Sequence, residues 1–402
     1  MRNTLLAAAF AGALVAATAA TGAQAASPVS GYIVMLRPDA NSTSIAAEHA
    51  RSHGAAVEHI YSHAIRGYSA KMSATAAQRL RTDGRVLLVQ PDGVMTTTAQ
   101  TLPTGIDRSD AELSPTAAID GVDSRVNVDV AVIDTGIQLT HPDLNVHTAG
   151  AKNCNTGSSA NDGNGHGTHV AGTIGALDNG VGVVGMAPGA RLWPVRVLGN
   201  SGSGSWAQVI CGIDYVAANA SQIEVANMSL GGSGSDSACG TNKDAMHEAI
   251  CAAVNRGVTF VVAAGNSAAD SSTFTPAAYD EVITVSALAD FNGTPGGGGA
   301  ATCRADVDDT FADFSNYGAD VDLIAPGVCI LSTWKGSAYS SISGTSMASP
   351  HVAGAAALYK ATHPTATPAA VKSALQAAGT TNWSTATDPD ATHERLLNVA
   401  GF

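Results

Sequence analysis

The strongest constraint on the fold is a series of short apolar runs that alternates with helical patterns after residue 99. The expected strands are continuous Val/Ile/Ala runs, which are typical of a parallel sheet covered on both faces. Such alternation predicts an α/β domain with helices on both sides of the sheet. Strands are expected at 128–133, 192–198, 223–228, 258–264, 282–287 and 321–325, and helices at 169–177, 206–219, 244–255 and 347–361.

A smaller unit is expected over residues 30–95. Its pattern is strand, helix, two strands, helix and strand, the order of a ferredoxin-like α+β fold. The segments are 32–36, 42–52, 57–72 for the two strands, 74–81 and 86–90. The polar stretch 96–101 then predicts an exposed linker, so the second domain is expected over 99–402.

The first 26 residues have the features of an export signal. Arg2 supplies the positive charge, Leu5 to Ala20 form an uncharged apolar run, and Ala23-Gln24-Ala25 offers small residues for cleavage. No other stretch approaches the ~20 apolar residues of a membrane helix. We therefore expect a soluble, secreted, extracellular protein.

All six cysteines follow this segment, and no C-x-x-C motif occurs among them. An even count in an oxidising compartment predicts three disulfides, although six cysteines allow 15 pairings. Short loops favour Cys239–Cys251 and Cys303–Cys329, which leaves Cys154–Cys211. Buried free thiols are the alternative.

Charge limits the possible partners. The net charge of −13 argues against a phosphate-binding surface, and therefore against a nucleic-acid partner. Residues 1–98 hold eight basic and five acidic residues, a net of +3, whereas residues 99–402 hold twelve and twenty-eight, a net of −16. This contrast favours a small segment that docks on the rest, with ordinary solvated faces as the alternative.

One glycine-rich motif does not predict a cofactor site. Gly180-Val181-Gly182-Val183-Val184-Gly185 matches G-x-G-x-x-G, but a dinucleotide fingerprint must follow a strand and open a helix. Here the motif follows an expected helix and precedes Pro188 and a strand. A loop is the better interpretation, and no organic cofactor is expected.

Four polar residues stand at the ends of expected strands or helices, each among small residues. Asp134 ends the run 130–133, His166 opens a helix, Asn266 follows 261–265, and Ser346 begins a long apolar helix. Ligands of parallel sheets bind at the carboxyl ends of strands, so we expect these side chains to meet. Taken singly, each could instead be a cap, an interior histidine or a turn residue.

Together the four residues predict nucleophilic acyl transfer. The Ser346 hydroxyl needs an adjacent base, which His166 supplies, and a buried Asp134 would orient the imidazole and stabilise its cation. The Asn266 amide and the Ser346 backbone N–H would stabilise the oxyanion of the tetrahedral intermediate. The positive end of the helix that begins at Ser346 adds to this stabilisation.

At these motifs the sequence resembles the subtilisin family of serine proteases. The motifs are Val132-Ile133-Asp134-Thr135-Gly136, Gly165 to Gly172, Ala264-Gly265-Asn266 and Gly344 to Gly354, in the family's order. The resemblance implies a three-layer fold, endopeptidase activity on proteins, and the family's catalytic roles for Asp134, His166, Ser346 and Asn266. It further implies a substrate groove with backbone walls at Ser229, Leu230, Gly231, Gly232, Ala264 and Gly265, to which an extended peptide adds as a strand.

The resemblance extends to the N-terminal unit. Residues 31–93 resemble the family's inhibitory propeptide, and Ala99 to Pro103 resembles a mature N-terminus. We therefore expect a precursor that cuts itself near residues 94–99, with its own propeptide as an intramolecular inhibitor. The expected enzyme is a monomer with protein or peptide substrates and with no nucleic-acid or membrane partner.

The resemblance also implies a structural calcium ion. The segments 141–144 and 177–183 resemble the family's strong calcium loop. Ca²⁺ takes oxygen ligands, here the side chains of Gln100, Asp143 and Asn179 and the carbonyls of Leu177, Val181 and Val183. Asp322 resembles a weaker cation position. An ordinary turn without a ligand is the alternative for the main loop.

Two other classes of protein are alternatives to a protease. An inactive secreted binding protein on the same fold would not need all four polar residues together. A serine esterase would carry G-x-S-x-G, but Gly344-Thr345-Ser346-Met347-Ala348 lacks the second glycine. Residues 290–311 are expected to be a local insertion relative to subtilisin.

Overall fold

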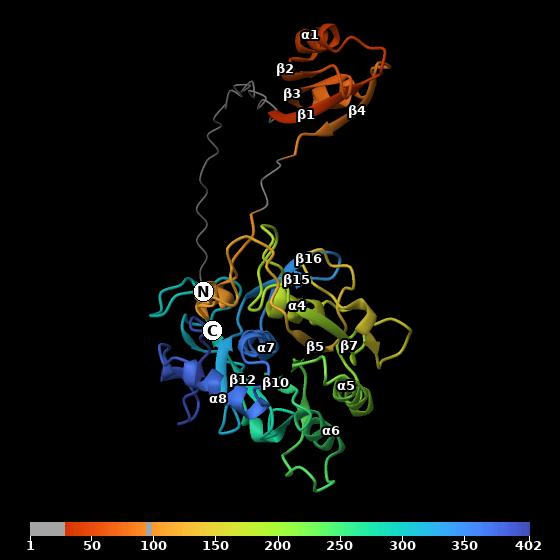
Figure 1. The fold of residues 1–402 in the computed structure, drawn as a ribbon. Coiled ribbons are helices and arrows are strands. Elements are labelled where there is room, and N and C mark those ends of the chain that lie inside the picture. The colour runs from red at the N-terminus through yellow and green to blue at the C-terminus, as the bar shows by residue number, and fades with distance from the viewer. Residues whose placement is uncertain (1–28, 94–98) are drawn as a thin grey trace, which may run out of the picture. The chain divides into compact units, whose positions relative to one another are not determined.

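A computed structural model describes residues 29–93 and 99–402 of the chain (Figure 1). The expected export signal, and most of the expected cleavage region, lie outside the described residues. The chain divides into two compact units, 1–97 and 98–402, which we call the N-terminal unit and the large unit.

The N-terminal unit has the expected β-α-β-β-α-β order. Its elements are β1 (Val29–Leu36), α1 (Ser42–His53), β2 (Ala56–Tyr61), β3 (Gly67–Ser73), α2 (Ala74–Leu80) and β4 (Val86–Pro91). The strands form an antiparallel sheet in the order β2-β3-β1-β4. Apolar residues of both helices, such as Ile45 and Leu80, pack with Val34, Tyr68 and Met72 of the strands. The α+β prediction is confirmed.

A nine-stranded sheet forms the centre of the large unit, in the order β17-β14-β12-β10-β8-β5-β7-β6, with β13 paired to β12. All of these strands pair in parallel except β13, which is antiparallel. Their bounds are β5 (Asp129–Asp134), β6 (Lys152–Asn153), β7 (Arg191–Arg196), β8 (Val225–Met228), β10 (Thr259–Ala263), β12 (Ile283–Ala289), β13 (Thr310–Phe311), β14 (Leu323–Pro326) and β17 (Arg395–Leu396).

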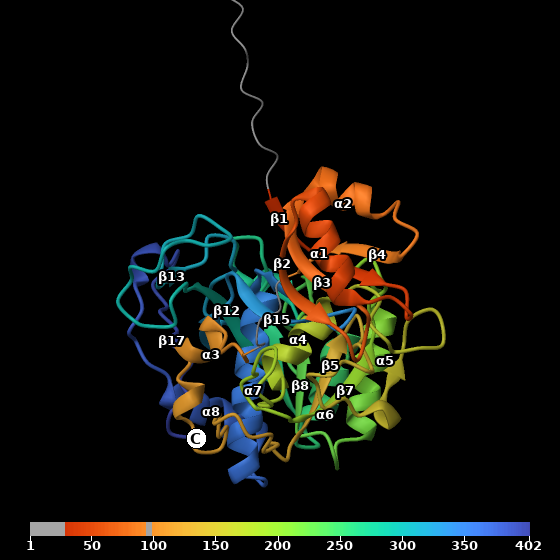
Figure 2. The same cartoon turned by 90° about the horizontal axis from the view of Figure 1, so that it is seen from above.

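Helices cover both faces of this sheet. The longer helices are α4 (His166–Gly175), α5 (Trp206–Ala218), α6 (Ala245–Val254), α7 (Thr345–Thr362) and α8 (Pro368–Ala378). In β5, Val130 and Val132 join the apolar core with α4, α7 and α8, whereas Ala131 and Ile133 join the core with α5 and α6. This alternation explains the continuous apolar runs, because both faces of each strand are buried. Figures 1 and 2 show α7 beside α8 and α5 apart from them.

Several elements were not predicted. They include α8, the short helix α3 (Thr104–Arg108), the short sheet strands β6, β13 and β17, the hairpin β15 (Ile330–Trp334) with β16 (Ala338–Ile342), and the small pair β9 (Gly232–Ser233) with β11 (Phe274–Thr275). The hairpin matters for the site, because it packs on α4. The residues 290–311 form a loop that ends in β13.

All three favoured disulfides are present: Cys154–Cys211, Cys239–Cys251 and Cys303–Cys329. The interpretation of the cysteines as free thiols is therefore wrong. The glycine motif at 180–185 follows α4 and leads to β7, so it opens no helix, as expected. Within the described residues, no helix is both long and apolar enough to cross a bilayer.

Candidate active site

The expected base and its partner meet at the carboxyl edge of the sheet. Asp134 is the last residue of β5 and His166 the first residue of α4. His166 Nδ1 lies 2.8 Å from Asp134 Oδ1 and 3.0 Å from Oδ2. The Asp134 side chain is fully buried, whereas that of His166 is 25% exposed. The carboxylate therefore holds one ring nitrogen, and the imidazole remains partly open to solvent.

A second buried carboxylate, which the sequence analysis missed, shapes the start of α4. Asp162 Oδ1 accepts hydrogen bonds from Thr135 Oγ1 at 2.9 Å and from Gly165 N at 2.8 Å. Its Oδ2 accepts from Thr168 N and Oγ1 at 3.0 and 2.6 Å. Gly165 has a φ of +117°, and a Cβ there would come 2.5 Å from the Trp334 ring of the hairpin. Only glycine fits this turn, which carries the imidazole toward Asp134.

Ser346 is the second residue of α7 and is tied to β8 through its backbone. The Ser229 hydroxyl donates to the Ser346 carbonyl at 2.8 Å, and Asn227 Nδ2 donates to the Ser229 hydroxyl at 2.9 Å. Ser349 Oγ in turn donates to Asn227 Oδ1 at 2.7 Å. We call Asn227, Ser229 and Ser349 the β8–α7 network. Asn227 was missed, although a polar residue inside the buried run 225–228 was a visible signal.

His166 and Ser346 line one pocket of about 560 Å³. The Ser346 hydroxyl donates to the Ser229 carbonyl at 3.2 Å, so its hydrogen bond is not directed to His166. Four expected groove residues line the same pocket: Ser229, Leu230, Gly231 and Gly232. Its lining also includes four apolar residues that were not predicted as groove residues: Leu198, Trp206, Val209 and Met246.

Asn266 is anchored beside α7, the helix that carries Ser346. Its Oδ1 accepts hydrogen bonds from Thr345 N at 2.8 Å and from Thr345 Oγ1 at 3.0 Å. These bonds identify Oδ1 as the accepting atom of the amide and fix its orientation. The Nδ2 atom is then the one that can donate a hydrogen bond. The expected wall residues Ala264 and Gly265 follow β10, and Asn316 Nδ2 donates to the Ala264 carbonyl at 2.9 Å. Neither is among the residues that line the pocket.

Two opposing effects act on the imidazole. Burial lowers the pKa of His166, but the charge of Asp134, its hydrogen bond and the more distant Asp162 raise it, and the net shift is upward. His169 and His351 are fully buried, and burial lowers their pKa values to about 3 and about 4. Among these three histidines, only His166 therefore combines solvent access with a raised pKa.

The expected calcium ligands also converge, with one exception. Gln100 Nε2 lies 2.6 Å from the Leu177 carbonyl and 3.1 Å from the Val183 carbonyl. Asn179 Nδ2 lies 2.9 Å from Asp143 Oδ1. Within the described residues no hydrogen bond reaches the Val181 carbonyl, whereas the Val181 N–H donates to Asn179 Oδ1 at 3.0 Å.

The surroundings of Asp143 indicate whether the expected ligands suit a cation. It is 1% exposed, and the described hydrogen-bond partners of its carboxylate are the neutral Asn179, Val183 and Tyr339. Burial raises the pKa of Asp143 to about 6, against the effect of these hydrogen bonds. A buried carboxylate without a basic partner, next to amides and carbonyls, matches the hard-oxygen donor set that Ca²⁺ takes.

Asp322, the expected weaker cation position, differs from Asp143 because it has a basic partner. Lys372 Nζ lies 2.8 Å from Asp322 Oδ1, and Thr284 N donates to Oδ2 at 3.0 Å. The lysine ammonium thus supplies the positive charge at this position, and we do not propose a metal there.

Comparisons with known proteins agree with this geometry. The sequence model of the subtilase family matches residues 125–398, and that of the peptidase inhibitor I9 family matches residues 31–98. The chain is 41% identical over 317 residues to an alkaline protease of Shouchella clausii, covering 79% of this chain and 75% of that protein. It is 42% identical over 331 residues to an extracellular serine proteinase of a Thermus species, covering 80% and 73%.

A solved structure agrees as well. The crystal structure of a cold-adapted subtilisin-like serine proteinase is 35% identical, with a TM-score of 0.57, covering 74% of this chain and 98% of that chain. The chain therefore belongs to the subtilase family. It is a subtilisin-like serine endopeptidase that carries an I9 inhibitor propeptide, as expected of a zymogen.

Proposed function

We propose that Ser346, His166 and Asp134 are the nucleophile, base and orienting acid of this endopeptidase. The observation that carries the proposal is the 2.8 Å contact between Asp134 and His166, at a pocket that Ser346 also lines. The Asp134 carboxylate holds the proton on Nδ1, so Nε2 is the basic nitrogen. Catalytic hydrogen bonds are often loose in unliganded enzymes, so rotation of the Ser346 hydroxyl from the Ser229 carbonyl to His166 is part of the proposal.

The proposed reaction has two stages. Ser346 Oγ attacks the peptide carbonyl while His166 takes its proton and then gives it to the leaving amine. Water then attacks the acyl-enzyme with His166 again acting as base, which releases the acid and frees Ser346. In both stages the oxyanion would accept hydrogen bonds from Asn266 Nδ2 and the Ser346 backbone N–H. The anchoring of Asn266 by Thr345 supports this role, because a fixed donor needs no reorganisation.

The proposed substrates are extended protein segments. Ser229 to Gly232 and Ala264 to Gly265 would form the two backbone walls, to which a peptide adds as a strand. The apolar residues Leu198, Leu230, Trp206 and Met246 around the pocket support a preference for apolar or aromatic side chains.

We further propose that residues 1–26 are the export signal, that 30–95 are the propeptide, and that 99–402 are the mature, secreted enzyme. The relatives named as extracellular support secretion, and the I9 match over 31–98 supports the propeptide. A monomeric state, and the absence of nucleic-acid and membrane partners, stay predictions.

The proposed calcium site consists of the side chains of Gln100, Asp143 and Asn179 and the carbonyls of Leu177, Val181 and Val183. A bound cation would supply the charge that compensates the buried Asp143 carboxylate. The site would join the start of the mature chain to the loop after α4, because Gln100 contacts both Leu177 and Val183.

Replacement of the nucleophile tests the triad. A Ser346→Ala chain should lose casein digestion and stay full length, because the same hydroxyl would cut the propeptide. A serine-directed sulfonyl fluoride should add its mass to Ser346 of the unaltered enzyme, mapped by peptide mass spectrometry. Normal processing of the Ser346→Ala chain, or labelling at another serine, would contradict the proposal.

A further inference from the structure

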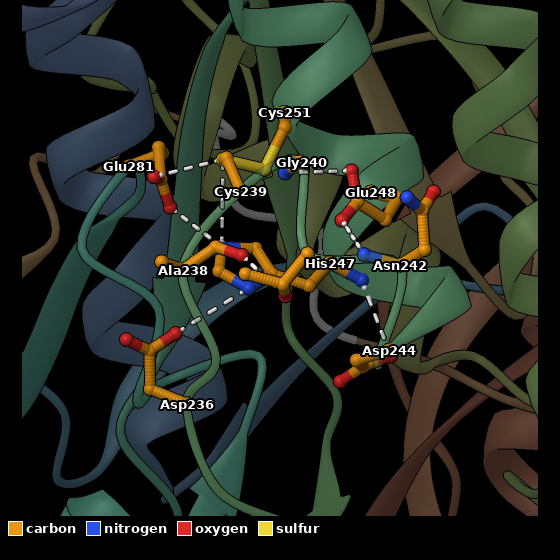
Figure 3. Close-up of a disulfide and its surroundings, with 11 residues drawn as sticks. Asp236, Ala238, Cys239, Gly240, Asn242, Asp244, His247, Glu248, Cys251 and Glu281 are labelled. Atoms are coloured by element: carbon orange, nitrogen blue, oxygen red, sulfur yellow. Dashed lines mark hydrogen bonds and ion pairs between the residues drawn. A yellow bond between two sulfur atoms is a disulfide. The ribbon is translucent and has the colours of Figure 1, made fainter.

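A group of possible metal ligands surrounds the Cys239–Cys251 disulfide (Figure 3). His247 and Cys251 are four residues apart on α6, and therefore share one helix face. Cys239 precedes this helix and Glu281 precedes β12. One ligand atom from each of the four residues lies within 4.8 Å of every other.

Glu281 contacts both His247 and Cys239 of this group. Its Oε2 lies 2.6 Å from His247 Nε2, and its Oε1 lies 2.9 Å from Cys239 Sγ. A disulfide sulfur has no proton to donate, so the second contact is not a hydrogen bond. Cys239 Sγ also lies 3.9 Å from His247 Nε2. Carboxylate, imidazole and sulfur atoms thus converge on one point.

The surroundings of His247 orient its ring for ligation. The side chain is 2% exposed, and Asp236 Oδ1 lies 3.4 Å from its Nδ1, on the side away from the sulfur. The imidazole stacks on Tyr279 with 4.0 Å between ring centroids. With the disulfide formed, Glu281 holds Nε2 and Nδ1 has no hydrogen-bond partner among the described residues; a metal on Nε2 would place the ring proton on Nδ1, facing Asp236, as in carboxylate–histidine–zinc arrangements.

We propose that reduction of this disulfide creates a zinc site with Cys239, Cys251, His247 Nε2 and Glu281 as ligands. Two thiolates, one imidazole and one carboxylate form a tetrahedral donor set of the kind that Zn²⁺ binds. Zinc–sulfur bonds of about 2.3 Å require the two sulfurs to separate to about 3.8 Å. The two sulfurs are bonded to each other now, so zinc binding requires the S–S bond to break first.

The disulfide and the zinc site exclude each other, because both use the same two sulfur atoms. A dithiol reductant attacks one sulfur, the S–S bond breaks, and the reductant leaves as its own disulfide after the transfer of two electrons. The two resulting thiols then exchange their protons for the metal ion. Cys239 is exposed and is the sulfur that a dithiol can approach, whereas Cys251 is 4% exposed.

The test uses the full-length Ser346→Ala chain, which does not digest itself if the proposed triad is correct. If it does cleave, the sulfonyl-fluoride-blocked chain takes its place, so failure of the triad does not affect this experiment. After limited dithiol treatment and anaerobic removal of the reductant, alkylation and mass mapping identify the free thiols. Cobalt(II) is the probe. We expect a thiolate-to-cobalt charge-transfer band with tetrahedral visible bands, which one equivalent of Zn²⁺ abolishes.

Variants distinguish this site from other reduced cysteines. C303S/C329S should keep the cobalt bands, whereas C239S/C251S should lose them. Asp236→Asn leaves all four ligands in place and should weaken zinc binding about 10–100-fold. Three results would overturn the proposal: a disulfide that resists reduction until the chain unfolds, free Cys239 and Cys251 thiols without cobalt bands, or unchanged bands in C239S/C251S.

Discussion

A single substitution of Asn266 should lower kcat without weakening substrate binding. Asn266→Ala removes a donor that acts only on the oxyanion, so kcat should fall about 10²–10³-fold, or 3–4 kcal/mol, with little change in KM. This magnitude is the one established for subtilisin itself. Steady-state kinetics on a short peptide amide measures both constants.

Thr345→Val is the matched control for Asn266. It removes one of the two hydrogen bonds to Asn266 Oδ1 and keeps the backbone one, so its loss of kcat should be smaller. Equal losses in kcat and in affinity for Asn266→Ala would mean that the amide binds the ground state.

The raised pKa of His166 predicts the acid side of the pH profile. Only the neutral imidazole can accept the Ser346 proton, so kcat/KM should fall as the pH drops through the pKa of His166, which is raised from the ordinary value of a histidine. Asp134→Asn removes the charge that raises this pKa and leaves the burial that lowers it. Its residual activity should therefore persist to lower pH. A pH profile of kcat/KM with unchanged acid midpoints would contradict this assignment.

At the scale of elements, the β8–α7 network holds the nucleophile's helix on the sheet. Asn227→Ala would leave the Ser349 and Ser229 hydroxyls without their buried partner. We expect a loss of about 1–3 kcal/mol in the free energy of unfolding, together with a lower kcat. Ser349→Ala, which keeps the bond from Asn227 to Ser229, should reduce stability but retain more activity. Denaturant unfolding of inhibitor-blocked enzyme measures the first quantity.

The longer helices and strands could be predicted from the sequence better than the side-chain contacts that form between them. The strands were recognisable because both of their faces are buried, and Asp134, His166, Asn266 and Ser346 because each stands at an element end. Asp162 was missed because its five described hydrogen bonds, four of them to residues 164–168, form only when the loop before α4 is folded. The hairpin β15–β16 was missed because its alternating pattern is short and only half buried.

At the scale of the whole molecule, the calcium proposal predicts that stability depends on the ion. Ligand binding to the folded state stabilises it by about 2.7 kcal/mol at 100 times Kd. EDTA should therefore lower the thermal midpoint of the inhibitor-blocked mature enzyme, and added Ca²⁺ should restore it. Calorimetry measures the shift.

Asp143→Asn is the control for the calcium experiment. Without the buried carboxylate its thermal midpoint should no longer respond to EDTA. A midpoint of the unaltered enzyme that ignores EDTA would remove the proposed site. A full response in Asp143→Asn would assign the ion to another place.

The carbonyl of Asp134 links the catalytic residues to the pocket wall. It accepts hydrogen bonds from the backbone N–H groups of Val197 and Leu198, at 2.8 and 3.1 Å, and Leu198 lines the pocket. The segment that shapes the cavity is thus the same segment that fixes the end of β5. Anyone redesigning cleavage preference at position 198 should expect turnover to change with it. Met246 also lines the pocket, but its backbone N–H donates to Asp244 instead of to β5, so changes there should affect turnover less.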